Sequence, residues 1–290
     1  TIDQLAQALA SGEEKSPRTP IIAVQAKGSL RPFFYLHGAW DSDAFYCFHL
    51  ARYLEPDQPF YALAPYNFDG LKSSPSVEEM AAAHIQALRS IQSEGPYLLG
   101  GFCNGGLVAY EMARQLQAEG QGVGLLVLIA PAYPPALHLL ARGVVSQVGN
   151  LFQMNQEKKL GYFLRLRHMY KYARRQRRAE NLQGFRVVDP SILTLIPTAD
   201  ALRQDDHGLL DWIIMDYCYE PFPGKITLIW PREEPFPGVW RAKAAREKDI
   251  ELHTIPGTHI SCRTDHVKAL AEELNRCLAE GQADALKGCK

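Results

Sequence analysis

The sequence lacks the features that mark several large classes of protein. No apolar run approaches the roughly 20 residues of a membrane-spanning helix, and the polar start Thr1–Gln4 is unlike a signal peptide. The six cysteines show no C-x-x-C spacing, so neither a zinc site nor a redox pair is indicated. A formal net charge of −1 argues against general nucleic-acid binding. We therefore expect no membrane or nucleic-acid partner, no metal and no intrinsic cofactor.

What the sequence does have is an ordinary globular composition. Hydrophobic residues make up 47% and charged residues 22% of the 290 residues, which is enough to bury a sizeable core. The length is large for one domain but fits an α/β sheet with an inserted segment. Scattered cysteines are typical of free thiols in a reducing compartment, so we expect a cytoplasmic protein.

Hydrophobic patterning alternates strands with helices over most of the chain. A capping box at Ser76-Val77-Glu78-Glu79 predicts a helix that ends near residue 92, and a closing helix is expected over 265–279. Strands are expected at 32–36, 60–63, 97–102, 125–129, 226–230 and 250–255. This alternation predicts an α/β fold with a mainly parallel central sheet and helices on both faces.

The same patterning divides the chain into segments. Residues 132–216 are mostly helical in pattern and interrupt the alternation, which predicts a helical lid over the carboxyl edge of the sheet. The segments that we expect are a short helical tail at 1–10, a polar linker at 11–28, a core at 29–131 and 217–280, the lid at 132–216, and a C-terminal tail at 281–290.

Cys103 lies in the most informative motif of the sequence. Gly101-Phe102-Cys103-Asn104-Gly105 has the pattern G-x-C-x-G and falls between an apolar strand and an amphipathic helix, the order of a nucleophile elbow. Glycines suit a strained turn that packs closely against both elements. The positive end of the helix would favour a thiolate, which predicts acyl transfer through this cysteine. A buried, inert cysteine and a serine replaced by cysteine remain the alternatives.

A base and an oxyanion hole are expected from other parts of the chain. His259 directly follows the predicted strand at 250–255, and a nucleophile followed by a late histidine is the chain order of α/β-hydrolases. An imidazole at that place would take the thiol proton and later protonate a leaving group. Two backbone N–H groups, those of Asn104 and Ala39, are the expected oxyanion donors.

The acid that would orient His259 is the least defined member. The strand at 125–129 ends at Ala130, where a carboxylate would have had good access to the imidazole. The remaining place follows the strand at 226–230, where Glu234 is the first candidate and Glu233 the second. A cysteine depends less on such a partner than a serine does, so a Cys-His dyad stays open.

Positive charge is concentrated in the predicted lid. Residues 151–180 carry nine basic side chains against two acidic ones, although the whole chain is nearly neutral. Such a run is either a solvated helix face or a landing site for an anionic partner, such as a phosphopantetheine arm or an acidic carrier domain.

Taken together, these motifs resemble the releasing thioesterase domains at the C-terminal ends of non-ribosomal peptide and polyketide synthases. The resemblance spans roughly 31–278 and is carried by Phe33-Phe34-Tyr35-Leu36-His37-Gly38, the elbow with Leu107 to Ala113, Pro221 to Leu228, and Pro256-Gly257-Thr258-His259. Thr1–Ala6 is similar to the tail of a carrier domain.

The resemblance implies an α/β-hydrolase fold and an acyl chain delivered on the phosphopantetheine arm of a carrier protein domain upstream in the same synthase. It implies Cys103 as nucleophile, His259 as base, and Ala39 and Asn104 as oxyanion donors. The sequence departs from most relatives in having cysteine instead of serine at 103, and from many in having alanine instead of aspartate at 130.

Two other functions stay open at this point. Dienelactone hydrolases also use G-x-C-x-G, so a stand-alone lactone or ester hydrolase is the second interpretation. A hydrolase-like module that only docks a carrier or partner protein is the third.

Overall fold

A computed structural model shows a seven-stranded sheet among the residues that it describes, namely 19–38, 45–68, 74–134, 136–179, 198, 202, 205–236, 240 and 246–287. The strand order is β1-β3-β2-β4-β5-β6-β7, and every neighbouring pair is parallel except β1 with β3. The strands are β1 (Ile21–Gln25), β2 (Phe33–Leu36), β3 (Phe60–Leu63), β4 (Tyr97–Phe102), β5 (Val123–Ile129), β6 (Ile226–Pro231) and β7 (Ile250–Ile255). The predicted mainly parallel sheet is confirmed.

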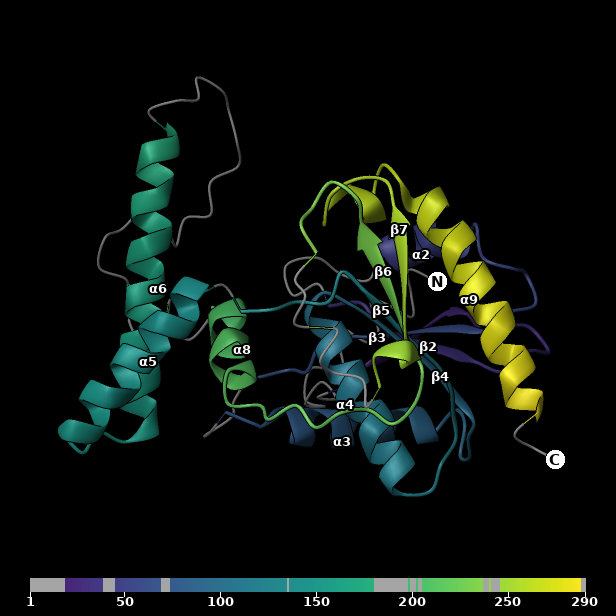
Figure 1. Ribbon diagram of the computed structural model, residues 1–290, viewed down its shortest axis with the longest axis horizontal. Helices are drawn as coiled ribbons and strands as arrows, with labels where there is room; N and C mark the ends of the chain where they lie inside the picture. The colour runs from purple at the N-terminus through teal and green to yellow at the C-terminus, as the bar shows by residue number, and fades with distance from the viewer. Residues whose placement is uncertain are drawn as a thin grey trace, which may run out of the picture.

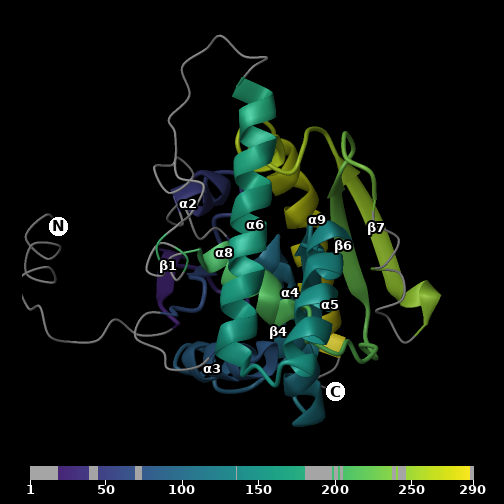
Figure 2. The same cartoon turned by 90° about the vertical axis from the view of Figure 1, so that its left-hand side faces the viewer.

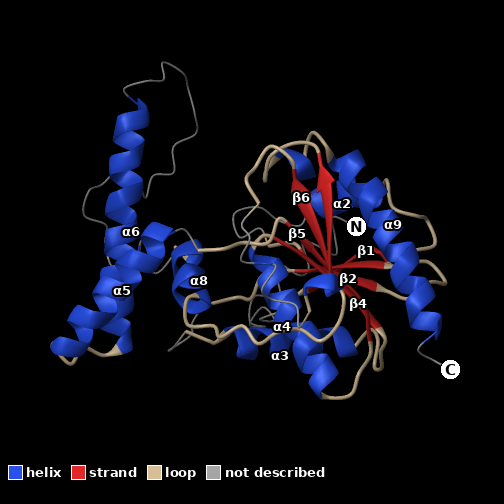
Figure 3. Ribbon diagram, viewed as in Figure 1, coloured by secondary structure: helices blue, strands red, loops and turns tan. Residues whose placement is uncertain are grey.

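Helices cover both faces of this sheet, as Figures 1 and 3 show. Helices α3 and α4 pack on one face and α2 and α9 on the other, and each face has its own buried apolar cluster. The helices are α2 (Phe45–Ala51), α3 (Val77–Arg89), α4 (Asn104–Ala118), α5 (Ala136–Leu151), α6 (Gln156–Ala179), α8 (Asp206–Ile214) and α9 (Val267–Lys287), with short 3-10 turns η3 (Glu247–Asp249) and η4 (Ser261–Arg263). The predicted capping box opens α3, where Ser76 and Glu79 each accept the other's backbone N–H.

Strand β1 corrects the predicted segment boundaries. We expected a linker over residues 11–28, but Ile21–Gln25 pairs antiparallel with β3 at the edge of the sheet. This short apolar segment next to Pro20 is a strand because it pairs with β3. The local sequence pattern does not reveal such a pairing. The expected carrier tail at 1–10 lies outside the described residues.

Helix α9 runs beyond its predicted end near residue 279 and into the segment predicted as a tail. Glycine often ends a helix, but Gly281 lies inside α9. In the structure, a Cβ at Gly281 would lie 2.8 Å from the Leu125 Cβ. The glycine therefore permits close packing of α9 on β5 and does not end the helix.

The described part of the segment between β5 and β6 contains three helices, α5, α6 and α8. Helices α5, α6 and α8 share a small apolar cluster that includes Phe163 and Trp212. Figure 1 shows α5 and α6 extending away from the sheet with α8 nearer the core, and Figure 2 shows α6 passing in front of the core. In the described part of the chain, none of the helices has the length and apolar character needed to cross a membrane.

Ion pairs use part of the basic charge in this insertion. Arg167 is 7% exposed and binds the carboxylates of Asp205 and Asp211, so its charge holds α6 against α8. The amine of the buried Lys159 donates to Asn150. Some of the predicted basic run therefore stabilises the insertion from within.

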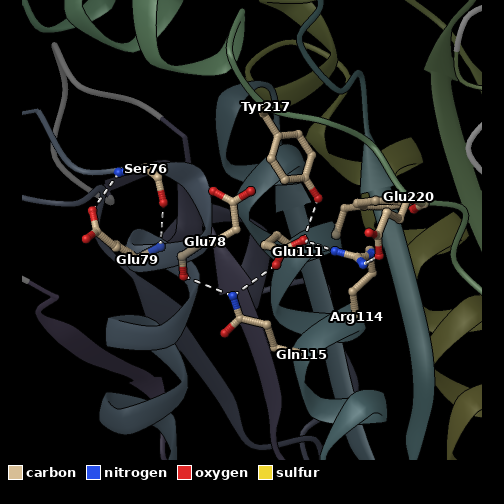
Figure 4. Close-up of polar contacts among 9 residues, drawn as sticks. Ser76, Glu78, Glu79, Glu111, Arg114, Gln115, Tyr217 and Glu220 are labelled. Carbon is tan, nitrogen blue, oxygen red and sulfur yellow. Dashed lines mark hydrogen bonds and ion pairs between the residues drawn. The ribbon is translucent and has the colours of Figure 1, made fainter.

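A buried carboxylate ties the end of the insertion to the helix after Cys103. Glu111 on α4 is 2% exposed and accepts hydrogen bonds from Tyr217, Arg114 and Gln115. Figure 4 shows these side chains converging on Glu111, with Glu220 bound to Arg114 beside them. The chain that returns from the insertion is thus anchored on α4.

Candidate active site

Cys103 lies where the strand order of the sheet reverses. The chain runs from β2 outward to β3, then returns to place β4 on the other side of β2. Open α/β sheets usually bind their ligands near such a reversal, beyond the carboxyl ends of the strands. Cys103 follows β4 directly, and its backbone has φ 52° and ψ −123°. A non-glycine residue in this region is strained, which is typical of functional sites.

Close packing of glycines holds the elbow in this conformation. A Cβ at Gly101 would lie 2.4 Å from the carbonyl oxygen of Gly105, and one at Gly38 would lie 2.0 Å from that of Phe102. Gly38 also has φ 63°, which favours glycine. The loop after β2 therefore lies directly against the nucleophile turn.

Of the two predicted oxyanion donors, only Asn104 lies among the residues that the structure describes. Asn104 is buried at the first position of α4, and its backbone N–H forms a hydrogen bond with the Cys103 sulfur. Ala39 falls outside the described residues. The neighbouring His37 is buried, and its carbonyl oxygen accepts a hydrogen bond from the Tyr46 hydroxyl at 2.8 Å. The role of Asn104 as an oxyanion donor stays a prediction.

His259 lies in the same cavity as Cys103. The cavity has a volume of about 400 Å³, and both residues line it although they are far apart in the sequence. The His259 ring lies on the ring of Phe102, with 4.7 Å between centroids. The structure therefore brings the predicted nucleophile and base together.

The acidity of the Cys103 thiol differs from the sequence prediction. Burial raises the pKa of this thiol to about 11, although the Asn104 hydrogen bond and the charge of Arg263 act to lower it. The negative charges of Asp211 and Glu234 raise the pKa further. Burial is the largest influence on this pKa, so the surroundings of the sulfur do not favour the thiolate that the helix end was expected to stabilise. Forming the sulfur anion requires a base.

His259 is suited to be that base. Burial lowers the pKa of its imidazole, and Glu234 partly opposes this shift while Arg263 adds to it. The imidazole is consequently neutral near pH 7 and able to accept a proton.

Glu234 is the carboxylate whose charge acts on His259. Its Oε1 accepts a hydrogen bond from the His259 backbone N–H at 2.5 Å, and its own backbone carbonyl accepts one from the Trp230 indole at 3.0 Å. Glu233 is exposed, and its backbone N–H binds the Gly257 carbonyl. Between the two candidates, the contacts with His259 favour Glu234.

The rest of the cavity is apolar, and the sequence analysis missed most of it. Ala130 has φ 40° and lies in the wall beside Cys103. Trp230 lies near the end of the neighbouring strand and contributes its indole. The remaining lining residues are Pro131, Ala132, Tyr133, Pro134, Ala136 and Pro235. The sequence signal that could have identified most of these lining residues is their position just after the carboxyl ends of β5 and β6, where open α/β sheets bind ligands.

Within the described ranges, no group of three or more His, Cys, Asp or Glu side chains is arranged to hold a metal ion. The five cysteines in those ranges are all free thiols.

Comparison with known families identifies the class of protein that this fold and site define. The model of the thioesterase domain family matches residues 31–278, which is most of the chain. The chain therefore belongs to the thioesterase domain family, and the predicted α/β-hydrolase fold and resemblance are confirmed.

Known relatives are multidomain synthetases. The chain is 34% identical over 128 residues to the nonribosomal peptide synthetase apvA of Aspergillus terreus, covering 43% of this chain and 14% of that protein. It is 39% identical over 106 residues to the polyketide synthase PksR of Bacillus subtilis, covering 36% of this chain and 4% of that protein. The chain thus spans only a small part of these relatives.

Solved structures show the same fold. The thioesterase domain of NocB from the nocardicin cluster has a TM-score of 0.59 at 21% identity, with 91% of this chain and 100% of that chain covered. A four-domain nonribosomal peptide synthetase bound to AMP and glycine has a TM-score of 0.61 at 22% identity, covering 95% of this chain and 21% of that one.

Proposed function

We propose that this domain releases an acyl, peptidyl or polyketide chain from a phosphopantetheine thioester through an acyl-enzyme on Cys103. The observation that carries the proposal is the strained Cys103 turn, with its sulfur in the same cavity as a neutral imidazole. Membership of the thioesterase domain family supports the reaction class.

The reaction follows from the two protonation states. His259 takes the Cys103 proton, and the sulfur attacks the carbonyl carbon of the incoming thioester. The tetrahedral oxyanion accepts the Asn104 N–H, with a second donor expected at Ala39. The bond from carbon to the pantetheine sulfur then breaks, and the leaving thiolate takes the proton from His259.

Release is the reverse of this chemistry with a different nucleophile. His259 removes a proton from water, or from a hydroxyl or amine of the substrate, and that group attacks the Cys103 thioester. The Cys103 sulfur leaves as a thiolate and regains the proton from His259. Depending on the attacking group, the product is an acid, a cyclic product or a transfer product.

A cysteine offers a specific advantage in this reaction. Moving an acyl group from one thiol to another changes the free energy little, and the new thioester stays more activated than a serine ester. Cys103 therefore keeps the acyl group reactive enough for a demanding release, such as lactone formation or transfer to an amine.

The proposal also names the partner and setting. The substrate arrives on the phosphopantetheine arm of a carrier domain upstream in the same synthase, and the protein needs no intrinsic cofactor. Exposed basic residues of α6, including Lys158 and Arg165, support the approach of an acidic carrier. Free thiols fit a reducing compartment, so we place the protein in the cytoplasm.

A substrate panel tests this function. Acyl-pantetheine thioesters, simple esters and lactones with the same acyl group are compared for wild type, C103A and C103S. The proposal expects turnover of thioesters well above esters, and loss of turnover in C103A. Preference for lactones or simple esters would support a small-molecule hydrolase instead, and absence of turnover on all three would support a docking module.

A further inference from the structure

Arg263 is a cation beside the active site to which the proposed mechanism assigns no role. It is half-buried at the end of η4, four residues after His259. Its guanidinium lies over two aromatic rings, 5.1 Å from the centroid of Tyr46 and 5.2 Å from that of Phe102. In the described part of the chain, no carboxylate forms an ion pair with it.

Each ring under this guanidinium belongs to a different part of the site. Phe102 immediately precedes Cys103, and its ring also contacts the ring of His259. The Tyr46 hydroxyl holds the carbonyl of His37, in the loop that contacts the nucleophile turn. Arg263 therefore joins the strand of the nucleophile and the loop after β2 to its own loop, which carries the base.

The loop from His259 to Arg263 is itself held in one conformation. The Thr258 backbone N–H donates to the Ser261 hydroxyl at 2.8 Å, and that of Cys262 donates to the Thr258 carbonyl at 3.0 Å. The Cys262 thiol donates to the His259 carbonyl at 3.4 Å. Because these hydrogen bonds make the loop rigid, a shift of the Arg263 side chain would also move His259.

We propose that Arg263 is a positioning residue, which fixes the His259 loop against the strand of Cys103 and holds a permanent positive charge beside the two reacting groups. This inference rests on the proposed function, in which Cys103 is the nucleophile.

The charge acts on both reacting groups in a useful direction. Arg263 lowers the pKa of the Cys103 thiol, against burial, Asp211 on α8 and Glu234 in the loop after β6. It also lowers the pKa of His259, together with burial and against Glu234. The imidazole therefore stays free to accept a proton, and the sulfur anion is formed beside a positive charge.

Arginine and lysine would supply the same positive charge at this place, but arginine makes better contacts with the two aromatic rings. A planar guanidinium can lie on two aromatic faces at once, whereas an ammonium group is a compact point charge on a flexible stem. Lysine at 263 would keep the charge and weaken the contacts. A neutral residue would remove the charge itself, so the two kinds of variant separate electrostatic from purely structural effects.

Alkylation of Cys103 by iodoacetamide provides the test. The rate is measured by peptide mass mapping from neutral to alkaline pH for the full chain and the variants R263Q, R263K and R263M. Exposed Cys218 in the same digest is the internal reference. R232Q is the matched control, because Arg232 is exposed in the loop after β6 and is not among the charges that shift the pKa of Cys103.

The proposal expects R263Q and R263M to slow Cys103 alkylation about tenfold at neutral pH and to move its pH profile upward by about one unit. In R263K the rate of Cys103 alkylation should fall by less than about threefold. In R232Q this rate should stay unchanged, and the rate of Cys218 alkylation should be the same in all variants. R263M keeps an apolar stem on the rings, so it gives the same readout if R263Q does not fold.

Wild-type alkylation profiles in R263Q and R263M would overturn the proposal, as would a loss in R263K equal to that in the neutral variants. Failure of the proposed function would look different. Thioester turnover would be absent in the wild type, while Cys103 alkylation would still respond to the charge at 263.

Discussion

Replacing Glu234 with glutamine separates the charge of this side chain from its hydrogen bond. The E234Q amide keeps an oxygen that can accept the His259 backbone N–H, so the loop geometry is retained. The negative charge, which raises the pKa of His259, is removed. The pKa of the imidazole should therefore fall further below its usual value.

The size of the shift follows from the position of the carboxylate. An opposite charge close to an ionisable group usually shifts its pKa by about 1–3 units. Glu234 is partly exposed, so solvent screening keeps its effect modest, roughly tenfold in rate. The acid limb of kcat/KM, which reports protonation of His259, should move to lower pH. The plateau should fall about tenfold, because the imidazolium formed during the reaction loses its neighbouring charge.

Thiol release from an acyl-pantetheine thioester, followed across the pH range with a disulfide dye, gives this profile. E233Q is the matched control, since Glu233 is the adjacent carboxylate and is exposed. A profile for E234Q that superimposes on the wild type would refute the reasoning and favour a Cys-His dyad. A shift in E233Q alone would assign the acid to Glu233.

Three further substitutions test other parts of the structure. G38A places a Cβ 2.0 Å from a backbone carbonyl at positive φ and should lower the free energy of unfolding by more than about 1 kcal/mol in urea titration; equal stability would contradict the packing of this loop. Y217F removes a donor to buried Glu111 and should cost about 1–3 kcal/mol by the same assay, so an unchanged midpoint would show that this anchor contributes nothing. A130D introduces a residue tolerant of positive φ beside the cavity and should change kcat by less than about threefold, whereas a tenfold gain would show that an acid is missing.

The central elements of the fold could be predicted because local signals and tertiary structure agree there. The apolar strand, glycine-rich turn and amphipathic helix around Cys103 all indicate one conformation, and the structure has it. Strand β1 and the end of α9 could not be predicted. Strand β1 depends on pairing with β3, which is distant in the sequence. In α9, Gly281 allows close packing on β5 and does not end the helix.

Electrostatics of the site were harder to predict than its composition. Cys103 and His259 follow from motif and chain order, but the depth of burial that raises the thiol pKa is a property of the packed structure. Arg263 carries no motif of its own, and its contact with Phe102 joins positions that are distant in the sequence. The sequence therefore indicates the candidate reacting groups, and the fold determines their protonation.

Intact-protein mass spectrometry after brief exposure to an acyl-pantetheine thioester tests the central claim most directly. We expect a mass increase equal to one acyl group, mapped by digestion to Cys103 and absent from C103A. In H259A the adduct should form far more slowly. An acyl adduct that persists in C103A, or that maps to another residue, would contradict the assignment of the nucleophile.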